Sequence, residues 1–378
     1  MLDAQVTTLI AAIVLYEVGT TVVKGFALTL MIGIVFSIFT AVIISQLFLS
    51  LVAGTEKFSK NKYFGVNEDG TPKQFLHKTF KFIKNRKIFY IASVAIIVIG
   101  LVFSLVGGMN YGIDFTGGTT IQVEMGEQVD INDVKDTIKS FDLDPSIIYT
   151  GEGNTQIQIN TINALDNAGR AEVFHAIADK YGLEDSALVA AEQFGPSVGK
   201  ELKQNAVTAV LIASIGMLIY IILRFKSWKY GFAAVVGVAH DVLMVLAFYA
   251  IFGYTINNPF IAAILTLVGY SINDTIVIFD RIRENNRKYA HGTMTRREVA
   301  DISVYESLGR TINTTITSLV TIVVLYILGV QSIREFALPL IVGMLAGNMT
   351  SIFIAPSLWG LWMDKKNGTK KEKEPKKA

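Results

Sequence analysis

The sequence predicts a polytopic α-helical membrane protein of eight spans, a six-helix bundle plus a two-helix hairpin of a second bundle, with one extracytoplasmic ferredoxin-like α+β domain. The first observation is composition: of 378 residues, 51% are hydrophobic and 17% are charged, whereas a soluble domain carries about 25% charged residues. The second is charge distribution. Residues 107–202 hold 16 Asp and Glu against five Lys and Arg, although the net charge of the chain is +2. Two aqueous faces of different character would produce this asymmetry.

Apolar stretches predict the spans, because a helix needs about 20 apolar residues to cross a bilayer. Two stretches, residues 6–23 and 312–329, are short or diluted by threonine, but each leads through a tight connection into a long one. The six long stretches are residues 26–52, 88–106, 206–223, 231–252, 260–279 and 336–362. We therefore expect eight spans.

Basic residues predict the orientation, since Lys and Arg are enriched in cytoplasmic loops. Residues 54–87 carry nine basic residues against three acidic ones, and residues 364–378 carry seven lysines. The connections 224–229 and 281–297 are also basic. We expect a cytoplasmic linker (54–87), a cytoplasmic tail (364–378) and both termini in the cytoplasm. The remaining parts are then a terminal hairpin (1–53), the first span of the six-helix bundle (88–106), the extracytoplasmic domain (107–202) and five further spans (203–363).

The extracytoplasmic stretch alternates strand and helix patterns in the order βαββαβ, which is the ferredoxin-like arrangement. The expected strands cover residues 119–124, 147–150, 155–160 and 188–194. The expected helices cover residues 130–140 and 164–181. The acidic residues of this domain are interpreted as solvated faces, since they lack the spacing of a calcium loop.

An internal repeat relates the two ends of the chain. Residues 7–44 align with residues 317–354 without a gap, at an offset of 310, with 13 identities in 38 positions. A repeat of the same hand indicates two related bundles about an axis along the membrane normal, as in some transporters. One bundle is represented only by its last hairpin, so we expect four further spans and a second exported domain before Met1.

Small residues in the repeat predict close helix packing. Gly343 and Gly347 form a GxxxG pattern, and Gly33 is the repeat partner of Gly343. Such patterns let helix backbones approach closely in membranes. We expect these glycines to pack the two halves together.

Three ionisable residues lie inside or at the edge of the spans: Asp241, Asp274 and Arg310. Each costs about 2.5–3.5 kcal/mol near a helix centre on insertion scales, so each needs a compensating role. An Asp274–Arg310 pair would be either a titratable gate or a static ion pair, and the residues alone favour neither. Asp241 beside His240 is explained by a hydrogen bond without function. The supporting polar residues are Tyr270, Asn273, Thr275 and Asn313.

Several classes of site are disfavoured. The chain has no cysteine and four scattered histidines, which excludes thiol chemistry and makes a metal site improbable. Residues 195–199 fit GxSxG, but the Asp and His of a hydrolase do not follow in a suitable place. We therefore expect no enzyme, no metal and no cofactor.

Three motifs resemble the SecF part of SecDF, a family within the resistance-nodulation-division superfamily. They are YGIDFTGGT at residues 111–119, which contains Gly112, Asp114, Gly117 and Gly118, GYSINDTIVIFDRIREN at 269–285, and SLGRTINTT at 307–315. Residues 2–54 resemble the last hairpin of SecD. The resemblance implies a bacterial cell-membrane protein that uses the proton or sodium gradient to promote late stages of preprotein export. It also implies that Asp274 and Arg310 relay the ion.

The resemblance further implies a set of partners. These are a SecD-like subunit or the missing SecD half, the SecYEG channel, SecA indirectly, the translocating preprotein, and YajC- or YidC-like proteins; no nucleic acid is expected. Two alternatives stay open. One is a membrane scaffold of the translocase that does not pump, and the other is a superfamily exporter of small molecules.

Overall fold

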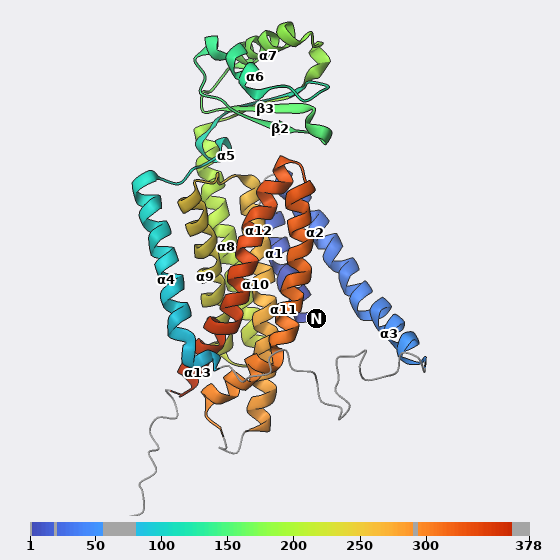
Figure 1. Ribbon diagram of the computed structural model, residues 1–378, viewed down its shortest axis with the longest axis vertical. Helices are drawn as coiled ribbons and strands as arrows, with labels where there is room; N and C mark the ends of the chain where they lie inside the picture. Colours follow the sequence, from blue (N-terminus) through green and yellow to red (C-terminus); the bar gives the residue numbers. More distant parts are fainter. Residues whose placement is uncertain (1, 19–20, 56–80, 290–293, 365–378) are drawn as a thin grey trace, which may run out of the picture.

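The computed structural model describes residues 2–18, 21–55, 81–289 and 294–364. A bundle of long helices carries a small α+β domain at one end (Figure 1). Among the described residues, seven helices are long and apolar enough to cross a membrane, and the remaining predicted span is the shorter apolar helix Gln5–Val18. The predicted fold class is confirmed: the chain is a multi-pass helical membrane protein with a small α+β domain.

The membrane helices include two short π-helical segments, η1 and η6. In chain order they are α1 (Leu2–Val18), α2 (Thr21–Phe39), η1 (Thr40–Ile44), α3 (Ser45–Ala53), α4 (Phe82–Gly107), α8 (Pro196–Phe225), α9 (Trp228–Phe252), α10 (Asn258–Lys288), α11 (Arg296–Leu328), α12 (Gln331–Met349), η6 (Thr350–Ile354) and α13 (Ala355–Asp364).

Several helices extend beyond the apolar stretches that predicted them. The helix expected at 312–329 begins at Arg296, where Thr295 and Glu298 form a capping box. The additional turns of α11 pack against the end of α10, with Asn285 donating to Ser303 at 3.1 Å. Helix α4 begins at Phe82 rather than at 88, and α8 begins at Pro196 rather than at 206. Hydropathy detects only the part of a helix that lies in lipid, so it misses these polar ends.

The small α+β domain has the predicted βαββαβ order. Its four strands form an antiparallel sheet in the order β2-β3-β1-β4. Helix α6 is shorter than expected and is followed by a single 3₁₀ turn, while α7 begins at residue 167 because Asp166 caps it. The elements are β1 (Gly118–Glu124), α6 (Ile131–Thr137), β2 (Ser146–Thr150), β3 (Gln156–Thr161), α7 (Asn167–Tyr181) and β4 (Leu188–Phe194).

One side of this sheet builds the domain core. Ile121 and Ile157 from the strands pack with Val134 of α6 and Phe174 of α7, and all four side chains are buried. The alternation of buried and less buried residues along β3 is the period of two expected for a strand with one covered face.

The internal repeat is also present in the helix boundaries. Adding 310 to the bounds of α2 gives the bounds of α12, and adding 310 to those of η1 gives those of η6. Two repeat partners, Phe26 and Phe336, meet edge to face with ring centroids 4.6 Å apart. The two hairpins are therefore related in local structure as well as in sequence.

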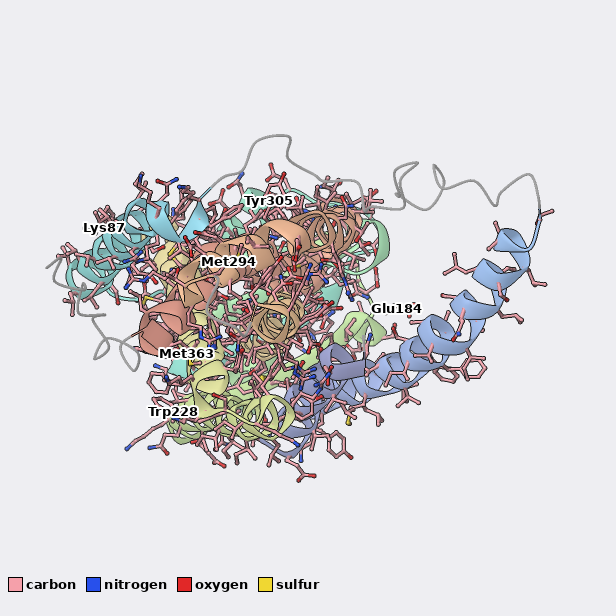
Figure 2. All side chains as sticks on the ribbon, turned by 90° about the horizontal axis from the view of Figure 1, so that it is seen from below. Lys87, Glu184, Trp228, Met294, Tyr305 and Met363 are labelled. Atoms are coloured by element: carbon pink, nitrogen blue, oxygen red, sulfur yellow. The ribbon has the colours of Figure 1, made fainter. Side chains whose placement is uncertain are left out.

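Helix α10 lies at the centre of the bundle, with 72% of its most apolar part buried. It packs against α1, α9, α11 and α12. By contrast, η1 and α3 run away from the bundle, as the view from below shows (Figure 2), and the residues of neither segment are buried. The centre of the bundle is thus the helix that carries Asp274.

Candidate functional site

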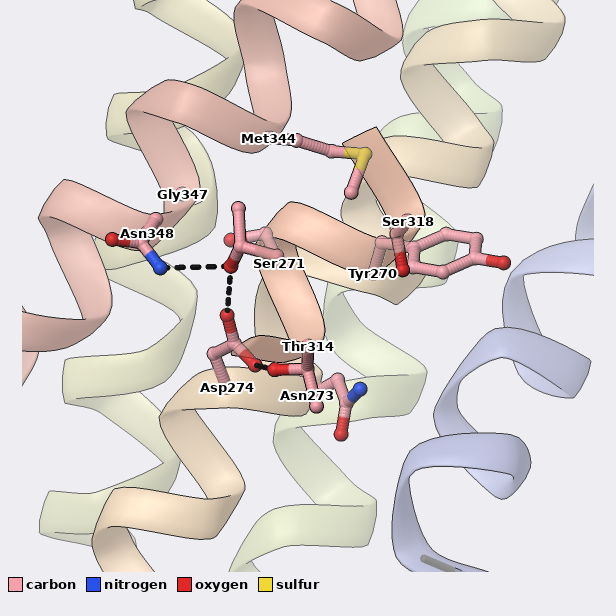
Figure 3. Close-up of a pocket in the computed structure, with 10 residues that line it drawn as sticks. Tyr270, Ser271, Asn273, Asp274, Thr314, Ser318, Met344, Gly347 and Asn348 are labelled. Carbon is pink, nitrogen blue, oxygen red and sulfur yellow. Dashed lines mark hydrogen bonds between the residues drawn. The ribbon is translucent and has the colours of Figure 1, made fainter. Parts of the chain in front are cut away.

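A small cavity lies beside Asp274, where α10, α11 and α12 meet (Figure 3). Its volume is about 30 Å³, which is enough for a water molecule. Its lining is mostly polar: Tyr270, Ser271, Asn273, Asp274, Thr314, Thr315, Ser318, Met344, Gly347 and Asn348.

Two threonines of α11 hold the Asp274 carboxyl group. The Thr314 hydroxyl donates to Oδ1 at 3.2 Å, and the Thr315 hydroxyl donates to Oδ2 at 3.0 Å. The amide of Asn348 donates to Thr315 Oγ1 at 2.7 Å and so joins α12 to the same group. Asp274 therefore connects three helices through neutral hydrogen-bonding partners.

The threonine hydroxyls can serve either protonation state of Asp274. Thr314 Oγ1 is also 2.9 Å from the backbone oxygen of Thr311, and Thr315 Oγ1 is 3.0 Å from the same oxygen. A hydroxyl has one proton to donate but can also accept. Each can donate to the carboxylate, or donate to its own helix and accept from a protonated carboxyl group.

The expected contact between Asp274 and Arg310 is not made. Among the described residues, no ion pair within 4.0 Å joins them, although the Arg310 charge acts on Asp274 electrostatically. The Arg310 side chain is exposed and lines a larger, mostly charged cleft with Asp280 and Glu306. The predicted contact of Arg310 with the Asp274 carboxyl group is made instead by Thr314, which lies one turn further along α11 and faces that group directly.

The other predicted polar residues are divided between several surroundings. Tyr270 and Asn273 line the cavity, as Figure 3 shows. Thr275 instead shares a hydrogen bond of 2.8 Å with Ser351 of η6. Asn313 is exposed on α11 and does not line the cavity.

Sequence reasoning missed Asn348 and did not single out Ser271, Thr314 or Thr315. The last three lie within the quoted motifs, so their hydroxyls were a signal that could have been used. For Asn348 the signal was the repeat, since its partner at the offset of 310 is the apolar Ile38. A polar residue that replaces an apolar one in only one copy of a repeat indicates a role specific to that copy.

A second buried cluster surrounds Asp241 of α9. Its side chain is 1% exposed, and its carboxyl group accepts hydrogen bonds from Ser271 of α10 and Thr350 of η6. His240 Nδ1 lies 3.0 Å from Asp241 Oδ1 and 2.8 Å from Thr350 Oγ1. The predicted histidine–aspartate contact is present as part of a network across three elements.

The glycines predicted to pack the two halves together have other neighbours in the structure. A Cβ on Gly343 would stand 2.2 Å from the Leu267 side chain of α10, and one on Gly347 would stand 3.3 Å from Ser271 Oγ. Both glycines therefore pack against α10, inside the six-helix bundle. A Cβ on Gly33 would meet nothing within 4 Å. The expected packing between halves is wrong for these residues in this chain, since the GxxxG face is turned toward α10.

The glycine-rich motif connects the small α+β domain to the membrane helices. Gly112 N donates to the Ile256 oxygen at 2.8 Å, and Asp114 Oδ2 accepts from Asn258 N, at the start of α10, at 3.1 Å. Burial raises the pKa of Asp114. Gly117 and Gly118 have φ values of 80° and 143°, which favour glycine, and a Cβ on Gly118 would be 2.1 Å from the Thr161 oxygen. The motif thus caps the helix that carries Asp274.

In the part of the chain that the structure describes, no group of three or more His, Asp or Glu side chains is arranged to hold a metal ion. The carboxyl group that lines the cavity is that of Asp274, and a carboxyl group can bind and release a proton.

Comparison with known proteins identifies this arrangement. The family model "Protein export membrane protein SecD/SecF, C-terminal" matches residues 174–365, and "SecD/SecF GG Motif" matches residues 102–129. The chain is 35% identical to protein translocase subunit SecDF of Bacillus subtilis, covering 95% of this chain and 50% of that protein. It is 36% identical to protein translocase subunit SecF of Sebaldella termitidis, covering 79% of this chain and 96% of that protein.

A solved structure shows the same fold. The crystal structure of SecDF from Thermus thermophilus, described as a translocon-associated membrane protein, has a TM-score of 0.79 and 31% identity, covering 96% of this chain and 48% of that one. The chain spans about half the length of the SecDF relatives it matches.

Proposed function

This chain belongs to the SecD/SecF family of protein-export membrane proteins, and we propose that it acts as an accessory component of the Sec translocase that promotes late stages of preprotein export. In this proposal, residues 82–364 are a SecF-type unit and residues 2–53 are the last hairpin of a SecD-type half. The observation that carries the proposal is the set of hydrogen bonds around Asp274, at the centre of the bundle.

The proposed source of energy is the proton or sodium gradient. Moving one charge across the membrane yields about 2.3 kcal/mol per 100 mV, so a few ions would suffice for a conformational change. Asp274 faces a water-sized cavity, and Thr314 and Thr315 can bond either its charged or its neutral form. Protonation would weaken the attraction of Arg310 and allow α11 to shift against α10.

Helix α10 would carry this shift to the exported domain. It is one continuous helix of 31 residues, and Asp114 caps its first turn. Asn258 and Asp274 are 16 positions apart, which is about 24 Å along a helix at 1.5 Å per residue. A tilt or translation of α10 would therefore move the anchor of the exported domain as well.

Location and partners follow from the same proposal. The protein would lie in the bacterial cell membrane with both termini in the cytoplasm and residues 107–202 outside. It would work with a SecD-type half, the SecYEG channel and the emerging preprotein, with SecA acting earlier and YajC- or YidC-like proteins nearby. The proposal gives the chain no enzymatic activity and no cofactor other than the coupled ion.

The test replaces Asp274 with Asn in the complete translocase, with the SecD-type half present. Gradient-dependent late translocation into membrane vesicles should fall at least about 10-fold, because Asn cannot take up a proton. Glu284→Gln is a matched control on the same helix, since the Glu284 side chain is 66% exposed and pairs with Arg281 at the surface. It should leave translocation within about 2-fold of the unchanged protein.

The alternatives predict other results. If Asp274→Asn supports normal gradient-dependent translocation, the coupling proposal is wrong and a scaffold that does not pump is favoured. Proton flux through the assembled complex, with and without Arg310→Ala, separates the two further. Absence of any proton flux that Arg310→Ala lowers would support the scaffold.

A further inference from the structure

The buried cluster around Asp241 touches the Asp274 cavity through a single side chain. Ser271 lines the cavity and also donates its hydroxyl proton to Asp241 Oδ2. Resting on the proposed coupling to protons, we propose that Asp241 is a second proton-binding position, which exchanges a proton with the Asp274 cavity through the hydroxyl of Ser271.

The first argument is proximity. Gly347 lines the cavity beside Ser271, and a Cβ there would stand 3.3 Å from both Asp241 Oδ2 and Ser271 Oγ. Because glycine has no side chain, position 347 places no side-chain atom between the cavity and the carboxyl group. Asp274 is three residues after Ser271, on the same side of α10.

The second argument is charge. His240 is the titratable group next to Asp241, at 3.0 Å. The elements packed against Asp241 present neutral groups to it. These are the hydroxyls of Ser271 from α10 and Thr350 from η6, and Gly347 from α12, which has no side chain. Among the described residues, no Lys or Arg lies within 4.0 Å of this carboxyl group. A fully buried carboxylate without a fixed cation is expensive, and this cost is the reason to propose Asp241 as the group that binds the proton.

The third argument is the free nitrogen of His240. Within the described structure, its Nε2 atom is buried and has no hydrogen-bond partner. A neutral imidazole with a proton on Nδ1 leaves Nε2 as a bare lone pair, whereas an imidazolium would bury an unpaired N–H. A neutral His240 that donates to Asp241 therefore fits the geometry, and the carboxyl group is the member of the pair that takes up the proton.

A static connection between helices would not require an acid here. The Thr275–Ser351 hydrogen bond already joins α10 to η6, one turn from Ser271, with two neutral hydroxyls. Unlike these two hydroxyls, the carboxyl group of Asp241 can change its charge by binding or releasing a proton. It also contacts the first residue of a π-helix, and π-helical turns are frequent at functional sites.

The transfer balances in protons. Protonated Asp274 gives its proton to a water in the cavity, and this water gives a proton to a lone pair of Ser271 Oγ. The proton that Ser271 held passes to Asp241 Oδ2. Asp274 ends as a carboxylate, Asp241 as a neutral acid, and Ser271 is again a neutral hydroxyl.

The test uses the complete SecDF-type assembly in proteoliposomes, with proton flux driven by a membrane potential. Ser271→Ala should lower the flux at least about 10-fold, and Ser271→Thr, which restores a hydroxyl, should stay within about 2-fold of the unchanged protein. Thr266→Val is the matched control: Thr266 is equally buried on α10, but its hydroxyl bonds only to the Ala262 oxygen of its own helix at 2.8 Å. It should not change the flux.

Infrared difference spectra give a second measurement that does not depend on transport. Acidification should produce a carboxylic-acid band that disappears in Asp241→Asn and persists in Asp274→Asn. Normal flux in Ser271→Ala, together with lost flux in Asp274→Asn, would overturn this inference and leave the proposed function intact. Absence of proton flux in the unchanged assembly would overturn both.

Discussion

The two copies of the repeat have the same helical boundaries at an offset of 310, but very different surroundings. Helices α2 and α12 correspond residue for residue, as do η1 and η6. Only 11% of the most apolar part of the α2–η1–α3 span is buried, against 61% in the α12–η6–α13 span. Leu49 and Trp359 stand at the same offset of 310, just beyond the aligned residues, yet the former is 58% exposed and the latter 0% exposed. The repeat therefore determines local helix geometry, and the neighbouring helices determine burial.

The same difference applies to polar residues. In the N-terminal copy, Gln5 donates to Ser37 at 3.3 Å, and in the C-terminal copy Asn348 donates to Thr315 at 2.7 Å. Gln5 and Thr315 stand at the same offset of 310, two positions before the aligned residues, so both hairpins have a polar contact at this level. The C-terminal contact meets Asp274, because α10 packs against α11 and α12 with Asp274 toward them. Both copies therefore share the hairpin structure, and the C-terminal copy in addition forms part of the site around Asp274.

The largest expected effect is the difference in unfolding free energy between alanine substitutions at Trp359 and at Leu49. Trp359→Ala removes a fully buried ring that packs on Tyr230, with centroids 5.4 Å apart, and should cost about 3 kcal/mol of unfolding free energy. Leu49→Ala removes exposed atoms and should change it by no more than about 0.5 kcal/mol. Reversible unfolding of this chain in mixed micelles measures both. Equal costs would show that the two hairpins are packed alike.

The next effect concerns the repeat partners Gly343 and Gly33. Gly343→Val forces side-chain atoms into Leu267 and should destabilise the chain by about 1–3 kcal/mol. Gly33→Val has open space and should be close to neutral, within about 0.5 kcal/mol. The same unfolding assay applies. A large loss from Gly33→Val would contradict the open environment of α2.

The smallest effect is the coupling of Phe26 to Phe336, an aromatic contact that joins the two copies. A double-mutant cycle with alanine at each position should give a coupling of about 0.5–1.5 kcal/mol. Phe89→Ala, which removes a ring stacked on Phe353 inside the six-helix bundle, serves as a control partner for Phe26→Ala and should add without coupling. Additive losses for Phe26 and Phe336 would argue against a shared contact between the copies.

Much of the fold could be predicted because it depends on local patterns. The length of apolar stretches located the spans, and the period-two pattern located the strands of the small α+β domain. Helix ends were less accurate: α11 begins 16 residues earlier than the apolar stretch at 312–329, because its polar turns pack on α10. The orientation in the membrane and the domain boundaries stay predictions.

The candidate site was predicted in part. Asp274 was found because an acid inside a span is costly and therefore needs a role. Its hydrogen-bonding partners were not predicted. The sequence pointed to Arg310 because its charge is opposite to that of Asp274, whereas in the structure Thr314 and Thr315 lie next to the carboxyl group. Charge is visible in a sequence, whereas the direction in which a side chain faces is not.

The sequence by itself determined that the chain crosses the membrane repeatedly, carries a βαββαβ domain, repeats a hairpin and places an acid in a central span. Each of these follows from the chemistry of residues that are close together along the chain. Only the tertiary structure decided that threonines hold Asp274, that Gly343 and Gly347 face α10, and that Ser271 connects Asp241 to the cavity. These depend on how each helix is rotated about its own axis and which helix lies beside it. That rotation is set by packing between residues far apart in the sequence.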